Sequence, residues 1–168
     1  AAILEEIQGS ADEIHTDAMG NLIARKGSKQ PNGLRIMISA HMDEIGLMVT
    51  HVDDDGFVRF ISIGGVSPLP CIGGRVIFMN GQRGVIGCER LEPNALPTLE
   101  KLFIDVGATS REDCPVKVGD VCGFERPFLD LGKHLVAKSM DNRISVVVAT
   151  EALRALKASP HEVYSVFS

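Results

Sequence analysis

The chain has 168 residues and a formal net charge of −5, and it is 45% hydrophobic and 23% charged, which is an ordinary globular composition. It has no Trp and one Tyr, and its Lys and Arg residues form no cluster, so the composition argues against a nucleic-acid surface. No apolar run approaches the ~18 residues of a membrane span, and the N-terminus lacks a basic-then-apolar signal pattern. We therefore expect a soluble cytoplasmic protein that binds neither nucleic acid nor membranes.

The four cysteines, at positions 71, 88, 114 and 122, include no CxxC pair. This spacing argues against a secreted disulfide scaffold and against a structural zinc site. We expect reduced thiols, since free cysteine usually packs as a small buried hydrophobic residue.

The first 63 residues alternate between helical and strand patterns. AAILEEI at the start resembles the end of an amphipathic helix, so we expect a chain that is truncated at its N-terminus. Strands are predicted over 22–26 and over 34–40, and the second is apolar on both faces, which indicates a central strand covered on two sides. The sequence DDDG at 53–56 predicts a hairpin turn; it resembles the start of a calcium loop but lacks the closing Glu.

From 64 to 131 the pattern changes, because short β-rich runs alternate with Gly and Pro. This spacing predicts a small β-barrel or sandwich. Only TSREDC at 109–114 has a helical pattern, with Thr109 or Ser110 as a possible N-cap.

The α/β pattern returns after residue 131. A strand over 134–139 leads into a helix over 140–158 that is apolar nearly all round in its first half, which indicates burial against a sheet. A last strand begins at 161, and from its abrupt end we expect a truncated C-terminus. The sequence therefore predicts an α/β lobe in two parts, residues 1–63 and 132–168. A β insertion over 64–131 separates the two parts.

His41 and Asp43 follow the predicted strand 34–40, at the end of the strand where ligands of open α/β sheets gather. Alternation along an extended chain would point both side chains the same way. A carboxylate beside a metal-binding His commonly accepts its second ring N–H and so fixes the tautomer. The same pair also occurs as a plain hydrogen bond without a metal. Glu44 is excluded as a general base, because an adjacent residue points away from that face.

Asp141 lies in SMDNR at 139–143, where a strand passes into a helix. A carboxylate there is stabilised by free N–H groups and the helix dipole, so helix capping is one interpretation. The other is a carboxylate that bridges two cations, with Asn142 and Arg143 helping to hold the loop. The sequence contains no GxSxG, P-loop, GxGxxG or HExxH motif.

With these two motifs on either side of a β insertion, the chain resembles the tetrahedral aminopeptidases, a family of glutamyl aminopeptidases, deblocking aminopeptidases and proteins labelled cellulase M. The matching stretches occur in family order and cover nearly the whole chain: SAHMDEIGLMVTHVDDDGFVRFISIGG, GRVIFMNGQRGVIG, LEKLFIDVGATSRED, VKVGDVCGF and LVAKSMDNRISVVVATEALRALK. The resemblance implies part of a phosphorylase/hydrolase-like zinc-peptidase α/β lobe, interrupted by a small all-β barrel that serves for dimerisation.

The resemblance also implies roles for three residues. His41 resembles the family's histidine that binds the first metal ion, and Asp43 resembles the catalytic carboxylate that orients this histidine. Asp141 resembles the aspartate that bridges two divalent ions, Zn or Co. It implies an aminopeptidase that hydrolyses peptides through a metal-bridging water, assembled as a homo-oligomer, a dodecamer built from dimers.

Some elements of the family pattern are missing from this chain. In the family, the strand matching 161–168 leads to two adjacent glutamates, one of them the general base, and an Asp and a His ligand follow. The segment between Gly87 and Leu99 is also short for the family. We therefore expect a partial copy of the enzyme that is inactive alone. A non-catalytic assembly or scaffold fragment is the alternative; a glycosidase is more remote, since the sequence shows metal-type spacing and no aromatic platform for sugars.

Overall fold

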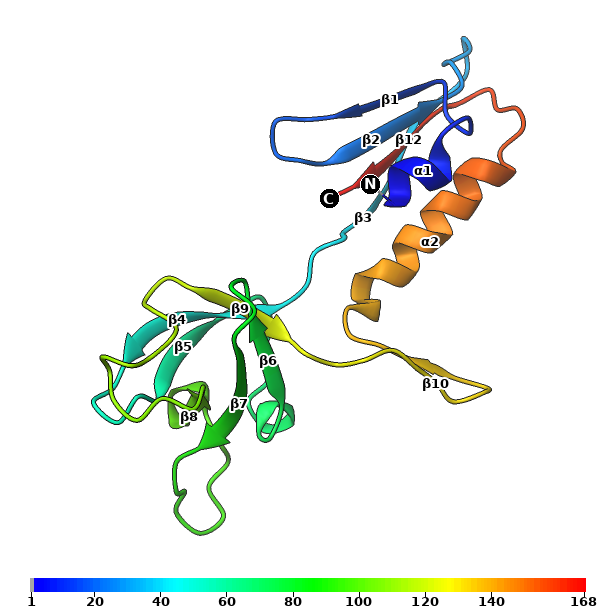
Figure 1. Ribbon diagram of the computed structural model, residues 1–168. Helices are drawn as coiled ribbons and strands as arrows, with labels where there is room; N and C mark the ends of the chain where they lie inside the picture. The colour runs from blue at the N-terminus through cyan, green and yellow to red at the C-terminus, as the bar shows by residue number, and fades with distance from the viewer. Residues whose placement is uncertain (1) are drawn as a thin grey trace. The chain divides into compact units, whose positions relative to one another are not determined.

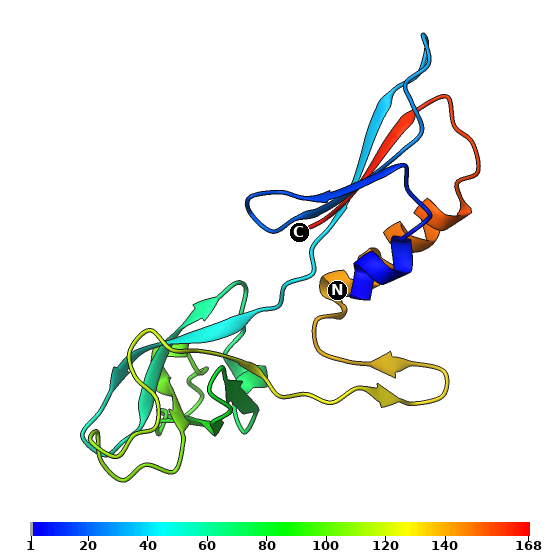
Figure 2. The same ribbon diagram turned by 45° about the horizontal axis from the view of Figure 1, so that its top comes forward.

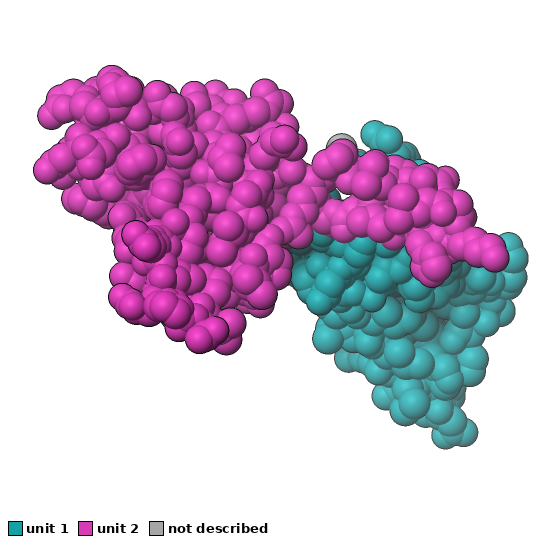
Figure 3. All heavy atoms as spheres, turned by 90° about the horizontal axis from the view of Figure 1, so that it is seen from below, with its two compact units in different colours: residues 1–43, 139–168 teal, residues 44–138 magenta. Residues whose placement is uncertain are grey.

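The computed structural model describes residues 2–168, and these form two compact units (Figures 1 and 3). Unit 1 contains the chain up to Asp43 together with Ser139–Ser168, and unit 2 is Glu44–Lys138. The chain thus leaves unit 1 after Asp43 and returns at Ser139, whereas the sequence predicted these boundaries at 63/64 and 131/132.

Unit 1 is a four-stranded sheet with two helices (Figure 1). The strand order is β1-β2-β12-β3, and β12 pairs antiparallel with β2 and parallel with β3. The strands are β1 Glu13–Thr16, β2 Leu22–Lys26, β3 Arg35–Ala40 and β12 Glu162–Phe167; the helices are α1 Ala2–Ile7 and α2 Met140–Ala155. The predicted N-terminal helix, the strand over 22–26 and the last strand are confirmed.

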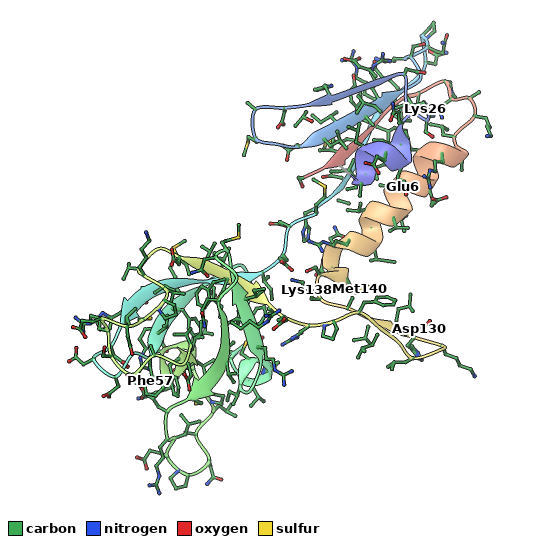
Figure 4. The ribbon with its side chains drawn as sticks, in the orientation of Figure 1. Glu6, Lys26, Phe57, Asp130, Lys138 and Met140 are labelled. Atoms are coloured by element: carbon green, nitrogen blue, oxygen red, sulfur yellow. The ribbon has the colours of Figure 1, made fainter. Side chains whose placement is uncertain are left out.

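Both helices lie on the same side of this sheet (Figure 2). The core between them and the strands consists of Ile7, Ala24, Ala40, Val146, Ala149, Leu153 and Phe167. Polar contacts tie the elements at the rim of this core: Arg154 on α2 bonds the side chain of Glu6, and Nζ of Lys26 donates to the carbonyl of Leu153 at 3.1 Å. Glu6 and Lys26 are labelled in Figure 4.

The prediction of a central strand over 34–40 was wrong, because β3 is the edge strand of the sheet and Met37 is 71% exposed. Helix α2 is likewise buried on one face only, and Ile144, Val147 and Val148 are exposed. Both differences have one physical cause. Strand β3 has β12 as its neighbour on one side and α2 over one face. Its other edge pairs with no strand among the described residues, and the apolar residues on its other face and on the outward face of α2 are exposed.

Unit 2 is a closed six-stranded barrel with the strand order β4-β5-β8-β7-β6-β9. Its strands are β4 Gly46–Val52, β5 Val58–Ile63, β6 Arg75–Phe78, β7 Arg83–Cys88, β8 Leu102–Asp105 and β9 Val121–Phe124. Two 3-10 turns, η1 Leu69–Cys71 and η2 Leu99–Lys101, and a short hairpin, β10 Leu129–Asp130 and β11 Leu135–Val136, complete the unit. Alternate strand residues fill the barrel with a single apolar core.

The predicted barrel is confirmed, but it begins earlier than expected. Strands β4 and β5, which the sequence assigned to the α/β lobe, pair with β9 and β8 and so close the barrel. The turn between β4 and β5 forms as predicted: Oδ1 of Asp53 accepts the Phe57 N–H at 2.8 Å, and Gly56 takes a φ of +85° that suits glycine.

The helix predicted over 109–114 does not form. The carboxylate of Asp113 accepts the backbone N–H groups of Thr109 and Ser110 at 3.1 and 2.9 Å, which closes a turn. A short polar side chain that bonds nearby backbone competes with helical hydrogen bonds. The four cysteines are unpaired thiols. Within residues 2–168, neither helix has the length and apolar character that crossing a membrane requires.

Candidate metal centre

The segment His41–Asp43 continues the line of β3 beyond its last residue. The backbone N–H of Ser168 donates to the carbonyl of Ala40 at 3.1 Å, and the N–H of Met42 donates to the carbonyl of Ser168 at 2.5 Å. The parallel pairing of β3 with β12 therefore extends past Ala40. An extended backbone points alternate side chains to the same side, which places His41 and Asp43 together.

The two side chains meet directly. Nδ1 of His41 lies 2.7 Å from Oδ1 of Asp43. An ionised carboxylate can only accept a hydrogen bond, so Nδ1 carries the proton, and in the neutral imidazole Nε2 then presents a free lone pair. This is the tautomer in which imidazole can bind a metal ion through Nε2.

Asp141 approaches His41 from the start of α2. The helix begins irregularly: Ser139 has a φ of +61°, Asp141 and Asn142 have non-helical dihedral angles, and the peptide bond between the last two is cis. Ser139 is the N-cap residue, and no side chain provides a cap hydrogen bond. The carboxylate of Asp141, 99% exposed, bonds no helix N–H within the described chain, so the helix-capping interpretation fails.

Nε2 of His41 lies 3.5 Å from Oδ1 of Asp141. Two ligands of one tetrahedral zinc ion, each at ~2.0–2.2 Å from the metal, lie about 3.4 Å apart. The observed separation fits a pair of ligands to one ion. As an ion pair it would stabilise the fold little, because the side chain of His41 is 45% exposed and that of Asp141 almost fully so.

Arg143 links the two segments that carry these side chains. Its Nε donates to the carbonyl of Met42 at 3.0 Å, so Met42 is held by Arg143 through its carbonyl and by Ser168 through its N–H. The sequence predicted that Arg143 and Asn142 would help to hold the loop. Arg143 does so, whereas Asn142 makes no side-chain hydrogen bond among the described residues.

Residues 2–168 contain no group of three or more His, Cys, Asp and Glu side chains that could hold a metal ion. His41 and Asp141 thus provide two donors, fewer than a tetrahedral ion requires. Glu44, excluded as a base from the sequence, begins unit 2 and pairs with Lys138 at 3.0 Å.

An apolar cavity of about 560 Å³ in unit 1 borders this centre, and no pattern in the sequence predicted it. Its walls include Met42 and Arg143 of the centre, together with Leu22 and the α2 residues Val146 and Val147. These residues come from separate segments, and each has an ordinary core pattern by itself. No local signal in the sequence could have identified them as neighbours of the centre.

Comparisons with known proteins agree with this architecture. The model of the M42 glutamyl aminopeptidase family matches residues 20–168. A putative aminopeptidase of Acetivibrio thermocellus is 46% identical over 99% of this chain and 51% of its own length. The chain spans about half the length of the curated relatives it matches.

Two solved structures show the same fold over 99% of this chain. An aminopeptidase from Desulfurococcus kamchatkensis has a TM-score of 0.86 at 38% identity, with 49% of its chain covered. The TET1 peptidase of Pyrococcus horikoshii, which can assemble into a tetrahedron or a large octahedral shell, has a TM-score of 0.77 at 31% identity, with 53% covered. By its sequence and its fold, this chain belongs to the M42 glutamyl aminopeptidase family.

Proposed function

We propose that this chain supplies the first part of the active centre of a two-metal aminopeptidase. The observation that supports the proposal is the approach of Nε2 of His41 to the carboxylate of Asp141, at a separation that suits two ligands of one ion. The hydrogen bond from His41 to Asp43 supports it further, because it orients the ring and, in the neutral imidazole, leaves the lone pair on Nε2.

In this proposal each residue has a distinct task. His41 would hold one metal ion through Nε2, and Asp141 would hold that ion together with a second one. Asp43 holds the imidazole in its tautomer, and Arg143 fixes the backbone between His41 and Asp43. Two divalent ions, Zn or Co, would polarise the scissile carbonyl of a peptide and make a bound water acidic near neutral pH.

The remaining machinery is proposed to lie in parts of the whole protein that this chain does not include. The chain covers 51% of the Acetivibrio thermocellus relative, and residues 2–168 contain no group of three or more His, Cys, Asp and Glu side chains that could hold a metal ion. The 168 residues alone would then be inactive. We further propose that the whole protein is a cytoplasmic homo-oligomer that degrades peptides, a dodecamer in which the barrel serves dimerisation. Support for the assembly comes from the similar TET1 peptidase, which forms a dodecamer and can assemble into a tetrahedron or a large octahedral shell.

A non-catalytic scaffold is the second candidate, and the incomplete donor set favours it. A glycosidase has less support, since Asp43 and Asp141 both face the one imidazole of His41 instead of flanking the space for a sugar bond.

Turnover in the full-length protein tests the proposal. The assay follows hydrolysis of aminoacyl-anilides with added Co²⁺, and it compares wild type, Asp141→Asn and the control Asp54→Asn, whose carboxylate pairs with Arg111 on unit 2. We expect loss of kcat in Asp141→Asn alone. Wild-type turnover in that variant would remove Asp141 from the mechanism.

A further inference from the structure

The outer wall of the unit 2 barrel has a hollow of about 560 Å³ that plays no part in the proposed metal centre. It is lined by Ile77 and Pro127 and by four charged side chains, those of Arg75, Glu125, Arg126 and Lys138. A volume of this size is typical of sites for small molecules, which range over ~300–1,000 Å³. Three of its four charged groups are cations, in a chain whose net charge is −5.

Strand alternation explains why Arg75 faces the hollow. On β6, Val76 and Phe78 are buried in the barrel core, so Arg75 and Ile77 point outward. The backbone N–H of Glu125 donates to the carbonyl of Arg75 at 2.9 Å, which continues the pairing of β6 with β9. The position of Arg75 beside Glu125 is therefore set by the barrel itself.

A glycine makes room for the third cation. Gly123 on β9 pairs with Ile77, and a Cβ added to Gly123 would lie 3.2 Å from Oε1 of Glu44 and 4.0 Å from Nζ of Lys138. The Glu44–Lys138 ion pair therefore lies over the bare backbone of Gly123. Lys138, labelled in Figure 4, follows β11 in the chain.

Two of the three cations lack a carboxylate partner. Glu125 pairs with Arg83 at 2.9 Å, outside the hollow, and Lys138 pairs with Glu44. The Arg75 side chain forms no hydrogen bond or ion pair anywhere in residues 2–168, and Arg126 forms none with a carboxylate.

Arg126 is held by neutral contacts alone. Its guanidinium lies 5.3 Å from the ring centroid of Phe124 and donates to the carbonyl of Pro70 at 3.2 Å. These contacts fix the planar group while leaving its positive charge uncompensated. A guanidinium that is positioned in advance loses less freedom when it binds a ligand.

We propose that this hollow is a binding site for a small oxyanion, a carboxylate or a phosphate, with Arg75 and Arg126 as its direct ligands and Lys138 as an additional positive charge. Both anions present paired oxygens that match the fork of a guanidinium. None of its lining residues has a role in the proposed metal centre, so this proposal stands or fails separately from the proposed peptidase function.

Titration of the metal-free 168-residue protein, followed by ¹H–¹⁵N NMR, tests this site. The buffer is Tris chloride without a chelator, because chelators are themselves polycarboxylates. N-acetylglutamate and inorganic phosphate are added separately, to wild type, Arg75→Ala, the double variant Arg75→Ala/Arg126→Ala, and the control Arg90→Ala. Arg90 is an exposed arginine that does not line the hollow.

We expect saturable shifts of backbone amides on β6 and β9, with an affinity that falls about tenfold for each guanidinium removed and is unchanged in Arg90→Ala. Because Arg75 is exposed, Arg75→Ala should keep the wild-type spectrum apart from local shifts. This single variant therefore tests the site even if removal of Arg126 in the double variant disturbs Phe124. Shifts with N-acetylglutamate alone would identify carboxylates as the ligand class, and shifts with phosphate alone would identify phosphates. Absence of saturable shifts with both anions, or equal affinities of Arg75→Ala and Arg90→Ala, would overturn the proposal.

Discussion

His41 and Asp141 face each other across 3.5 Å, although the whole of unit 2 separates them in the sequence. Both are positioned by backbone of unit 1: His41 by the continued pairing of β3 with β12, and Asp141 by the irregular start of α2. Arg143 joins these two segments through the carbonyl of Met42. The approach of these two side chains is thus built into unit 1 alone.

Replacing Asp43 by Asn should weaken metal binding without removing a ligand. The amide cannot accept the Nδ1–H of His41 with the strength of a carboxylate, so the imidazole loses orientation and basicity. Loss of such a supporting contact lowers metal affinity about 10- to 100-fold. Calorimetry with Zn²⁺ measures the change, and Asp54→Asn on unit 2 is the matched control. Equal affinities of the two variants would contradict the role assigned to Asp43.

Ser165→Ala should make the protein more stable. Ser165 is 1% exposed under α2, and its hydroxyl has no hydrogen-bond partner within residues 2–168. A buried hydroxyl without a partner costs ~1–3 kcal/mol, so we expect the free energy of unfolding to rise by about 1 kcal/mol.

Urea denaturation measures this change. Ser39→Ala, at an exposed position of the neighbouring strand β3, is the control and should alter the free energy of unfolding little. A less stable Ser165→Ala variant would show that the hydroxyl is satisfied in solution.

Cys122 should resist thiol reagents in the folded protein. It is 5% exposed in the barrel, and burial raises the pKa of its thiol to about 12 from an ordinary value of 9.0. The reactive thiolate is therefore scarce at neutral pH. Iodoacetamide labelling read by mass spectrometry should modify the half-buried Cys88 and Cys114 first, and Cys122 only on unfolding. Labelling of Cys122 at the rate of Cys114 would contradict its burial.

The same thiol should make stability depend on pH in the alkaline range. Because the pKa of Cys122 is higher in the folded than in the unfolded state, its contribution is fully present below pH 9 and is lost as the pH rises from 9 toward 12. Cys122→Ala should reduce this alkaline loss of stability in urea titrations across pH 8–10. An unchanged slope would mean that another group is responsible.

The sequence predicted most elements correctly, because their local patterns were strong. The DDDG turn, the strand over 22–26 and the last strand all formed where their residues indicated. His41 and Asp141 were identified from their places at strand and helix ends. The distance between their side chains could not be predicted, because it depends on how α2 packs against β3 and β12.

Other features depend on long-range partners that a local pattern cannot contain. The sequence pattern placed strands β4 and β5 in the α/β lobe. Their pairing with β9 and β8 in the structure assigns them to the barrel. The segment 109–114 had helical composition, but hydrogen bonds to Asp113 stabilise a turn instead. The apolar residues of β3 correctly indicated a strand, yet they did not reveal that it lies at an edge.

The side-chain nitrogen resonances of His41 provide the most direct test of the central claim, that Nε2 of His41 and Asp141 bind one cation. In metal-free protein at neutral pH, ¹⁵N NMR should show a protonated Nδ1 and an unprotonated Nε2. Added Zn²⁺ should shift Nε2 of His41 and leave His15, His51, His134 and His161 unchanged, and the shift should be strongly reduced in Asp141→Asn. A response of His41 that is the same in Asp141→Asn, or zinc that binds only at the other histidines, would contradict the account.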